Sequence, residues 1–282
     1  MNKYQGRIAF VTGGAACIGR ALCSELAAAG ATVVVADINE QGAAKVAKSL
    51  RHGGGRADAL RLDVSDGQAV ARSLREAAAR HGRLDYVFNN AGISIAGDAR
   101  DVSEAQWRRI VDINLWGVLH GTRAAYEIMA RQGSGHIVNI ASLAGLLTFP
   151  ANVPYSMTKH AVVGLSLSLR AEAADLGVKV SVVCPGYVKS DIFESSTMLN
   201  APRDKVMAQI PFGLMDTADA ARTILERVAR NPAVIVFPRY ARLLWWLYRV
   251  SPGLLAPLER KTIRDFRAVR TAPPLAEEES TT

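Results

Sequence analysis

The sequence predicts an α/β fold: a single doubly wound parallel sheet of about seven strands, flanked by helices, with a helical extension at the C-terminus. Short apolar runs alternate with longer helical stretches, and most intervening segments are long enough for the crossover helices that parallel strands require. The length agrees, because 282 residues with 49% hydrophobic content can bury one large core. The expected strands are residues 7–12, 32–36, 57–62, 84–89, 135–141, 178–184 and 233–237.

The first expected strand leads into a glycine-rich turn. Residues 7–12 are followed by Gly13, Gly14 and Gly19, and then by the apolar helical stretch 21–27. Strand, glycine turn and helix form the context in which such glycines bind nucleotides, since the backbone can approach a pyrophosphate closely. The free N–H groups at the start of the helix favour the same anion. The pattern therefore predicts a dinucleotide-binding turn.

The second expected strand ends at an acidic residue, Asp37. A carboxylate there can accept hydrogen bonds from an adenosine ribose and would repel a 2′-phosphate. Ile38 follows, and no Lys or Arg stands between Thr32 and Gln41 to attract that phosphate. The sequence therefore predicts NAD rather than NADP. The alternative, that Asp37 merely ends a strand, is weaker because of its spacing from the glycine turn.

Three polar residues further along suggest proton chemistry. Ser142 follows an apolar run at 136–141, so its hydroxyl is expected at the carboxyl end of a strand, where open α/β sheets bind ligands. Tyr155 and Lys159 stand four residues apart and share one face of a helix. A nearby ammonium lowers the pKa of a phenol from about 10, so such a Tyr can exchange a proton with an alcohol or ketone. Alone, the pair would fit a half-buried Tyr beside a surface Lys.

Other chemistries find little support in the sequence. The three cysteines, Cys17, Cys23 and Cys184, form no Cys-x-x-Cys pair, and the five histidines are scattered. Neither a metal site nor a disulfide framework is indicated. Residues 1–10 lead straight into the first strand, so no cleavable signal peptide is expected and a cytoplasmic location is the default.

Taken together, these motifs resemble the short-chain dehydrogenase/reductase family over roughly residues 5–240. Thr12-Gly13-x-x-x-Cys17-x-Gly19 looks like its cofactor loop, and Asp63-Val64 like the pair that holds the adenine. The remaining matches are Asn89-Asn90-Ala91-Gly92 beside the cofactor, the catalytic tetrad Asn114, Ser142, Tyr155 and Lys159, and the Pro185-Gly186 turn.

The resemblance implies a Rossmann-like domain over residues 1–239 that binds NAD and forms a homodimer or homotetramer. Its expected cofactor-binding residues are Gly13, Cys17, Ile18, Gly19, Asp37, Ile38, Asp63, Val64, Asn90, Ala91, Gly92, Tyr155, Lys159, Pro185, Gly186, Val188 and Ser190.

The implied mechanism interconverts an alcohol and a ketone by hydride transfer to or from NAD. Tyr155 would be the general acid/base, Lys159 would lower its pKa and bond the nicotinamide ribose, and Ser142 would hold the substrate oxygen. Asn114 would anchor a water in a proton relay. Bringing the pKa of a Tyr from about 10 to near 7 requires roughly 4 kcal/mol. We expect Lys159 and the oxidised cofactor to supply it together.

Two positions depart from the family pattern. Cys17 stands where the family usually has Gly, so its side chain is expected to crowd the pyrophosphate approach. Its place at a helix N-terminus favours the thiolate, but a tolerated small residue is the simpler interpretation. Ser190 stands where a Thr often bonds the carboxamide, and it keeps the hydroxyl.

The sequence says less about the substrate than about the cofactor. Residues 188–215 correspond to the family's substrate lid and are rich in Met and aromatic residues, which indicates an adaptable apolar pocket. An apolar secondary alcohol or ketone is expected, although the same side chains could equally be lid packing. The apolar set comprises Ile93, Leu143, Leu146, Leu147 and Phe149, with Val188, Ile192, Phe193, Met198, Leu199, Met207, Ile210, Phe212, Leu214 and Met215.

The C-terminal segment carries most of the excess charge. Residues 239–270 hold eight basic and two acidic side chains, a net +6 of the chain's +8. No nucleic-acid motif accompanies them. We expect two short amphipathic helices within 240–270 that cap the substrate mouth, with Leu258, Thr262, Phe266 and Val269 as one apolar stripe. They would rest on a membrane surface, as a peripheral contact, or else pack on the core or on a second subunit. Residues 271–282 are expected to be disordered.

Two other functions stay open on the same fold. One is a catalytically weak NAD-binding sensor, for which Cys17 leaves room. The other is a membrane-docked interaction protein.

Overall fold

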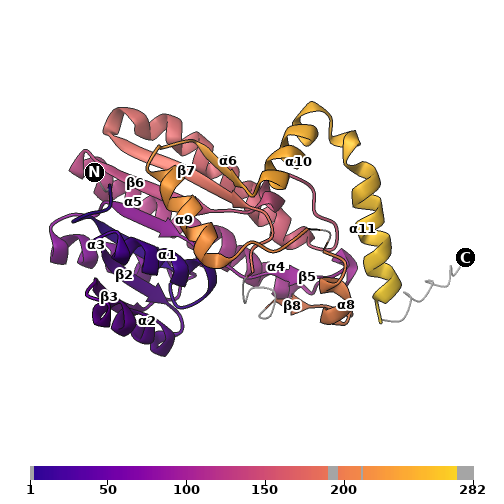
Figure 1. The fold of residues 1–282 in the computed structure, drawn as a ribbon, viewed down its shortest axis with the longest axis horizontal. Coiled ribbons are helices and arrows are strands. Elements are labelled where there is room, and N and C mark those ends of the chain that lie inside the picture. The colour runs from indigo at the N-terminus through magenta and orange to yellow at the C-terminus, as the bar shows by residue number, and fades with distance from the viewer. Residues whose placement is uncertain (1–2, 190–195, 211, 272–282) are drawn as a thin grey trace, which may run out of the picture.

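The computed structural model describes residues 3–189, 196–210 and 212–271, and it confirms the predicted α/β fold (Figure 1). Seven parallel strands form one sheet in the order β3-β2-β1-β4-β6-β7-β9. Each expected strand is present with its ends shifted by no more than two residues. Their bounds are β1 Ile8–Thr12, β2 Thr32–Asp37, β3 Arg56–Arg61, β4 Tyr86–Asn89, β6 Gly135–Ile140, β7 Val178–Pro185 and β9 Val234–Phe237.

Helices cover both faces of this sheet because side chains alternate along each buried strand. In β1, Ala9 and Val11 pack with α1 (Cys17–Ala28), α2 (Glu40–His52) and α9 (Thr217–Val228). Ile8 and Phe10 point the other way, into the core formed with α3 (Gly67–His81) and α5 (Gly117–Gln132). The remaining helices are α4 Glu104–Val111, α6 Val153–Ala173, α8 Arg203–Met207, α10 Arg239–Val250 and α11 Ala256–Val269.

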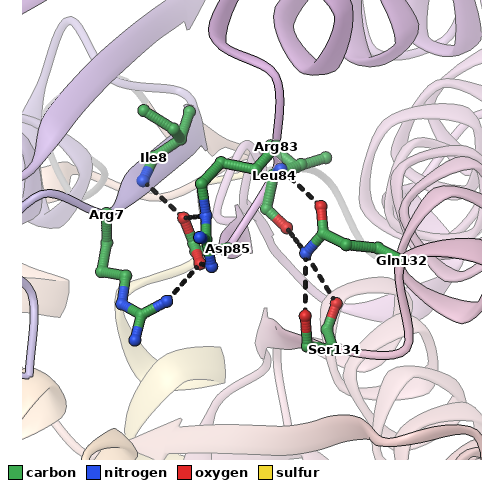
Figure 2. A network of polar contacts seen from close by, with 7 residues as sticks. All are labelled: Arg7, Ile8, Arg83, Leu84, Asp85, Gln132 and Ser134. Carbon is green, nitrogen blue, oxygen red and sulfur yellow. Dashed lines mark hydrogen bonds and ion pairs between the residues drawn. The ribbon is translucent and has the colours of Figure 1, made fainter.

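The N-terminal edge of the sheet is closed by a polar network (Figure 2). The buried carboxylate of Asp85 accepts hydrogen bonds from the Ile8 amide at 2.9 Å and from the guanidinium groups of Arg7 and Arg83. Gln132, at the end of α5, exchanges hydrogen bonds with both backbone groups of Leu84. These contacts tie β1, β4 and α5 together, and the opposite, carboxyl edge is the one that carries a cavity.

A small second sheet pairs β5 (Ile95–Ala96) with β8 (Thr197–Met198). The sequence did not predict it, because strands of two residues show no periodicity. This small sheet and an isolated bridge between Val188 and Met215 attach the expected lid segment at its beginning, middle and end. Ser190, Ile192 and Phe193 lie outside the described residues.

The C-terminal segment forms two helices, as expected. Ala241 and Leu244 of α10 pack on the core over β7 and β9, and α11 runs from the end of α10 towards α8 (Figure 1). Within the described residues, no helix combines the length and apolar character needed to cross a bilayer.

The predicted apolar stripe of α11 was wrong in part. Leu258 and Thr262 are exposed, whereas the inward face carries Leu255, Ile263 and Phe266. Arg270, also on this side, bonds to Asp101, and Arg267 reaches the buried Asp98. Both these ion pairs and apolar burial hold the α11 helix, and composition alone did not indicate the ion pairs.

Candidate active site

A cavity of about 390 Å³ opens at the carboxyl edge of the sheet. Its wall follows the ends of β3, β2, β1, β4, β6 and β7, five strand spacings that correspond to about 24 Å. Most residues predicted from the sequence line it together: Gly13, Cys17, Ile18, Asp37, Ile38, Asp63, Val64, Asn90, Ala91, Gly92, Ser142, Tyr155, Lys159, Pro185, Gly186 and Val188. Gly19 and Asn114 stand behind the wall.

The glycine turn fits an anion. The α1 helix begins without a side-chain cap and without an acidic residue in its first turn, so its first amides face the cavity beside Cys17 and Ile18. Gly19 contributes through close packing, since a Cβ there would lie 2.0 Å from the Gly13 carbonyl oxygen. Cys17 adopts a φ of 50°, in the left-handed region that disfavours any side chain. This is the conformation in which the family's usual Gly fits best.

The β2 end of the cavity fits an adenosine. One oxygen of Asp37 accepts a hydrogen bond from the Ala15 amide at 3.0 Å, and the other accepts from the Asn39 amide at 2.9 Å. Ile38 is 59% exposed and forms an apolar wall beside this carboxylate. Hydrogen bonds from Ser65 lower the pKa of Asp63, which keeps that side chain ionised. The donor and acceptor set therefore suits the sugar and base of a dinucleotide.

Hydrogen bonds fix the strand ends in the middle of the cavity. The Thr12 hydroxyl accepts from the amides of Asn90 and Ala91 at 2.9 and 3.1 Å. The side-chain amide of Asn90 donates in return to the Thr12 carbonyl at 3.0 Å. These hydrogen bonds hold the glycine turn against the Asn89–Gly92 segment, so the two segments together form the middle of the cavity wall.

Ser142, Tyr155 and Lys159 meet at the other end of the cavity. Ser142 follows β6, and its hydroxyl oxygen accepts from the Ala144 amide at 3.1 Å while the hydroxyl also bonds to Tyr155. The Lys159 ammonium lies 5.5 Å from the centroid of the Tyr155 ring and donates to the Ile140 carbonyl at 2.9 Å. The expected cluster is thus assembled from a strand end and one helix face.

The predicted lowering of the Tyr155 pKa is not found in the protein alone. Burial raises the pKa of Tyr155 to about 12, although a hydrogen bond from Ser142 works in the opposite direction. Burial also lowers the pKa of Lys159 to about 8, which weakens the cation that was expected to stabilise the phenolate. For both groups, desolvation by burial is the largest cause of the shift in pKa.

Asn114 lies one layer behind this cluster, within a π-helical turn over Asp112–Trp116. It is fully buried; its amide donates to the Ile93 carbonyl at 2.9 Å, and its oxygen accepts from the Ile93 amide at 2.8 Å. A Cβ on Gly92 would come within 3.2 Å of Asn114 and 3.5 Å of the Lys159 ammonium. Asn114 therefore fixes the wall segment at Gly92 and Ile93.

The part of the cavity beside Ser142 has several apolar lining residues. Ile93, Leu143, Phe149 and Val188 line it, whereas Leu147 is buried in the core and Leu146 packs against that core. Among the described lid residues, only Val188 reaches the wall; Phe212 stacks on Tyr240 with ring centroids 4.1 Å apart, and Met215 packs on the sheet core. For these residues, the alternative of lid packing fits better than substrate contact.

Four lining residues with polar side chains were missed by sequence reasoning: Ser94, Arg109, Asn152 and Tyr187. Asn152 stands three residues before Tyr155, and its side-chain oxygen is buried without a partner within the described residues. Tyr187 directly follows the Pro185-Gly186 turn, and its amide donates to the Tyr240 hydroxyl at 2.7 Å. Asn152 and Tyr187 could have been found from their neighbours in sequence. Arg109 lies one helical turn before Ile113, and both line the cavity. Arg109 belongs to no motif that the sequence shows.

Within the described residues, no cluster of His, Cys, Asp or Glu could hold a metal ion. The fold and this cavity define a dinucleotide-dependent oxidoreductase scaffold, and comparison with known proteins agrees. The family model for short chain dehydrogenases matches residues 7–199. This chain belongs to the short-chain dehydrogenase/reductase family.

Several relatives and solved structures resemble it. The oxidoreductase UcpA of Escherichia coli K12 is 35% identical over 72% of this chain and 78% of its own. The 2,5-dichloro-2,5-cyclohexadiene-1,4-diol dehydrogenase LinX of Sphingobium indicum is 34% identical over 79% of this chain and 89% of its own. A short-chain dehydrogenase/reductase from Burkholderia phymatum, solved in complex with NAD, matches with a TM-score of 0.78 and 28% identity. That match covers 98% of this chain and 100% of the solved one.

Proposed function

We propose that this protein is an NAD-dependent dehydrogenase or reductase that interconverts an apolar secondary alcohol and its ketone. The observation that carries the proposal is one continuous cavity with Asp37 at one end and Ser142, Tyr155 and Lys159 at the other. An acid at the ribose position favours NAD over its 2′-phosphorylated form. The similar Burkholderia phymatum structure contains NAD, which supports the same choice.

The substrate class rests on the wall beside Ser142. Ile93, Leu143 and Phe149 offer apolar contact, and Phe149 meets the Tyr187 ring edge-on at a centroid distance of 6.3 Å. Asn152 adds one polar side chain on the same side. Such a wall suits a ring or chain with a single polar function. The relative LinX is named for a cyclic diol, which is consistent with this class.

The chain's own residues would divide the chemistry as follows. The Ser142 hydroxyl donates to the substrate oxygen and holds it against the Tyr155 hydroxyl. Tyr155 gives a proton to that oxygen in reduction and removes it in oxidation. Lys159, held by the Ile140 carbonyl, places positive charge beside the phenol. A bound nicotinamide supplies hydride exchange at the substrate carbon. Its positive charge in the oxidised form would also offset the burial that raises the pKa of Tyr155.

The test is a spectrophotometric screen of hydrophobic secondary alcohols and ketones with NAD and NADP, using the parent and Tyr155→Phe proteins. Loss of the proton donor should lower turnover by about a hundredfold or more, while the Kd for NAD stays within about twofold. Tyr126→Phe, on α5 outside the cavity wall, is the matched control and should leave turnover unchanged. Turnover of Tyr155→Phe within a few-fold of the parent would contradict the assignment. NAD binding without turnover of any substrate would instead favour a sensor.

A further inference from the structure

The α10 helix presents an apolar stripe to solvent. Leu243, Trp246 and Val250 are 57%, 60% and 63% exposed. They recur every three to four residues and therefore lie on one side of the helix, opposite the side that Ala241 and Leu244 bury. Leu254 and Leu258 extend the exposed apolar surface past the end of the helix, at 53% and 39%. The packing of α10 on the core does not account for this much exposed apolar surface.

Positive charge borders the stripe. Arg239, Arg242 and Arg249 are exposed, and they line a groove of about 450 Å³ together with Leu243, Trp245 and Trp246. No ion pair engages these three arginines in the part of the chain that the structure describes; Arg249 lies over the Trp245 ring at 5.4 Å. The sequence from 227 to 258 contains five arginines and no acidic residue.

Three other basic groups of the C-terminal segment, by contrast, have acidic partners within the fold. Arg267 and Arg270 on α11 bond to Asp98 and Asp101, and Lys261 pairs with Asp265. Around α10, burial and then the charges of Arg242 and Arg230 lower the pKa of Arg227, and the charge of Glu226 opposes this less strongly. Apart from the contact of Arg249 with the Trp245 ring, no anionic side chain in the part of the chain that the structure describes compensates the three α10 arginines by an ion pair, so an external anion is their natural partner.

We infer that the outward face of α10 docks on an anionic lipid surface. Trp favours the headgroup level of a bilayer, apolar side chains enter the acyl boundary, and arginines attract anionic headgroups. A second copy of the chain fits less well, because a two-fold contact would bring the same arginines of both copies together. This inference stands independently of the proposed reaction.

The experiment is co-sedimentation of the full-length protein with vesicles of phosphatidylcholine, either alone or with about 30% phosphatidylglycerol, at about 0.1 M salt. We expect binding to the anionic vesicles and at least tenfold weaker binding to the neutral ones. Arg242→Gln with Arg249→Gln should lower the partition coefficient about thirtyfold, as two arginines at an anionic surface predict. Leu243→Gln with Trp246→Gln should lower it by at least tenfold.

The matched control is Arg72→Gln with Arg75→Gln, which removes two exposed arginines from α3, on the far side of the molecule from α10 in Figure 1. Its partition coefficient should stay within about twofold, and circular dichroism should show that every variant is folded. The inference is overturned if the parent ignores anionic vesicles, or if the α10 and α3 variants bind alike. It is also overturned if light scattering shows that the Leu243 and Trp246 substitutions reduce the assembly size, because the face would then be a subunit contact.

Discussion

The Asp37 carboxylate lines the cavity, and it also accepts hydrogen bonds from the Ala15 and Asn39 amides. We predict that the parent prefers NAD to NADP by at least tenfold in kcat/KM, equivalent to about 1.4 kcal/mol. Asp37→Ala should erode this preference, since it removes the charge that repels a 2′-phosphate. Initial rates at varied cofactor concentration measure the ratio.

Asp37→Asn is the informative companion, because it removes the charge while keeping one acceptor oxygen for one of the two amides. If the charge sets the preference, Asn should erode it as Ala does, while the melting temperature falls less. Equal use of both cofactors by the unaltered protein would refute the assignment of Asp37.

Cys17 combines a crowded position with an unfavourable backbone conformation. Its φ of 50° costs roughly 1–2 kcal/mol for a residue with a Cβ. We predict that Cys17→Gly raises the unfolding free energy by about 1 kcal/mol and lowers the Kd for NAD, since both the strain and the side chain are removed. Urea unfolding and fluorescence titration measure the two effects.

Cys17→Ala separates these effects, because it shortens the side chain and keeps the Cβ that causes the strain. It should recover part of the affinity and little of the stability. An unchanged or weaker affinity in Cys17→Gly would mean that the turn has already adapted to the thiol.

At the scale of the element, strand β6 carries an acid-sensitive group, His136. Burial lowers the pKa of this imidazole to about 3, and it bonds to the Ser181 hydroxyl at 2.9 Å. Between that value and the ordinary 6.5, the unfolded chain binds more protons than the folded one, so stability falls as the pH falls. The loss from this group between pH 7 and pH 5 should be about 2 kcal/mol.

The measurement is urea unfolding of the parent and of His136→Gln at both pH values. Gln keeps a hydrogen-bonding group for Ser181 but does not titrate, so its stability should fall by about 2 kcal/mol less than that of the parent. His52→Gln, at an exposed position of α2, should behave like the parent. Identical losses in the parent and His136→Gln would show that other groups cause the acid sensitivity.

At the level of helices and strands, the sequence predicted the elements that have a regular pattern of apolar residues and missed those that lack one. Most of the strands were found because buried parallel strands are continuous apolar runs, whereas the edge strand β3 alternates apolar and polar residues. The two-residue strands β5 and β8 carry no such pattern. The error in the α11 stripe has a different cause: Arg270 and Arg267 face carboxylates on a distant loop, and these partners are invisible to periodicity.

At the scale of the whole molecule, the cofactor wall was predictable because each motif stands at the end of a strand that the sequence also predicted. The pKa of Tyr155 was not, because the spacing of Tyr155 and Lys159 reveals their proximity but not the desolvation that opposes it. Arg109 and Tyr187 reach the cavity through the arrangement of whole elements, which no local motif records.

The ion pairs between α11 and the loop after β5 have a consequence for the order in which the protein is built. Asp98 and Asp101 bond to Arg267 and Arg270 across 169 residues of chain. A ribosome therefore releases every residue of the dinucleotide wall, the last of which is Val188, well before it makes the helix that covers the lid side. A chain that stops before residue 256 would carry the complete cofactor wall, while its substrate side would lack the last covering helix.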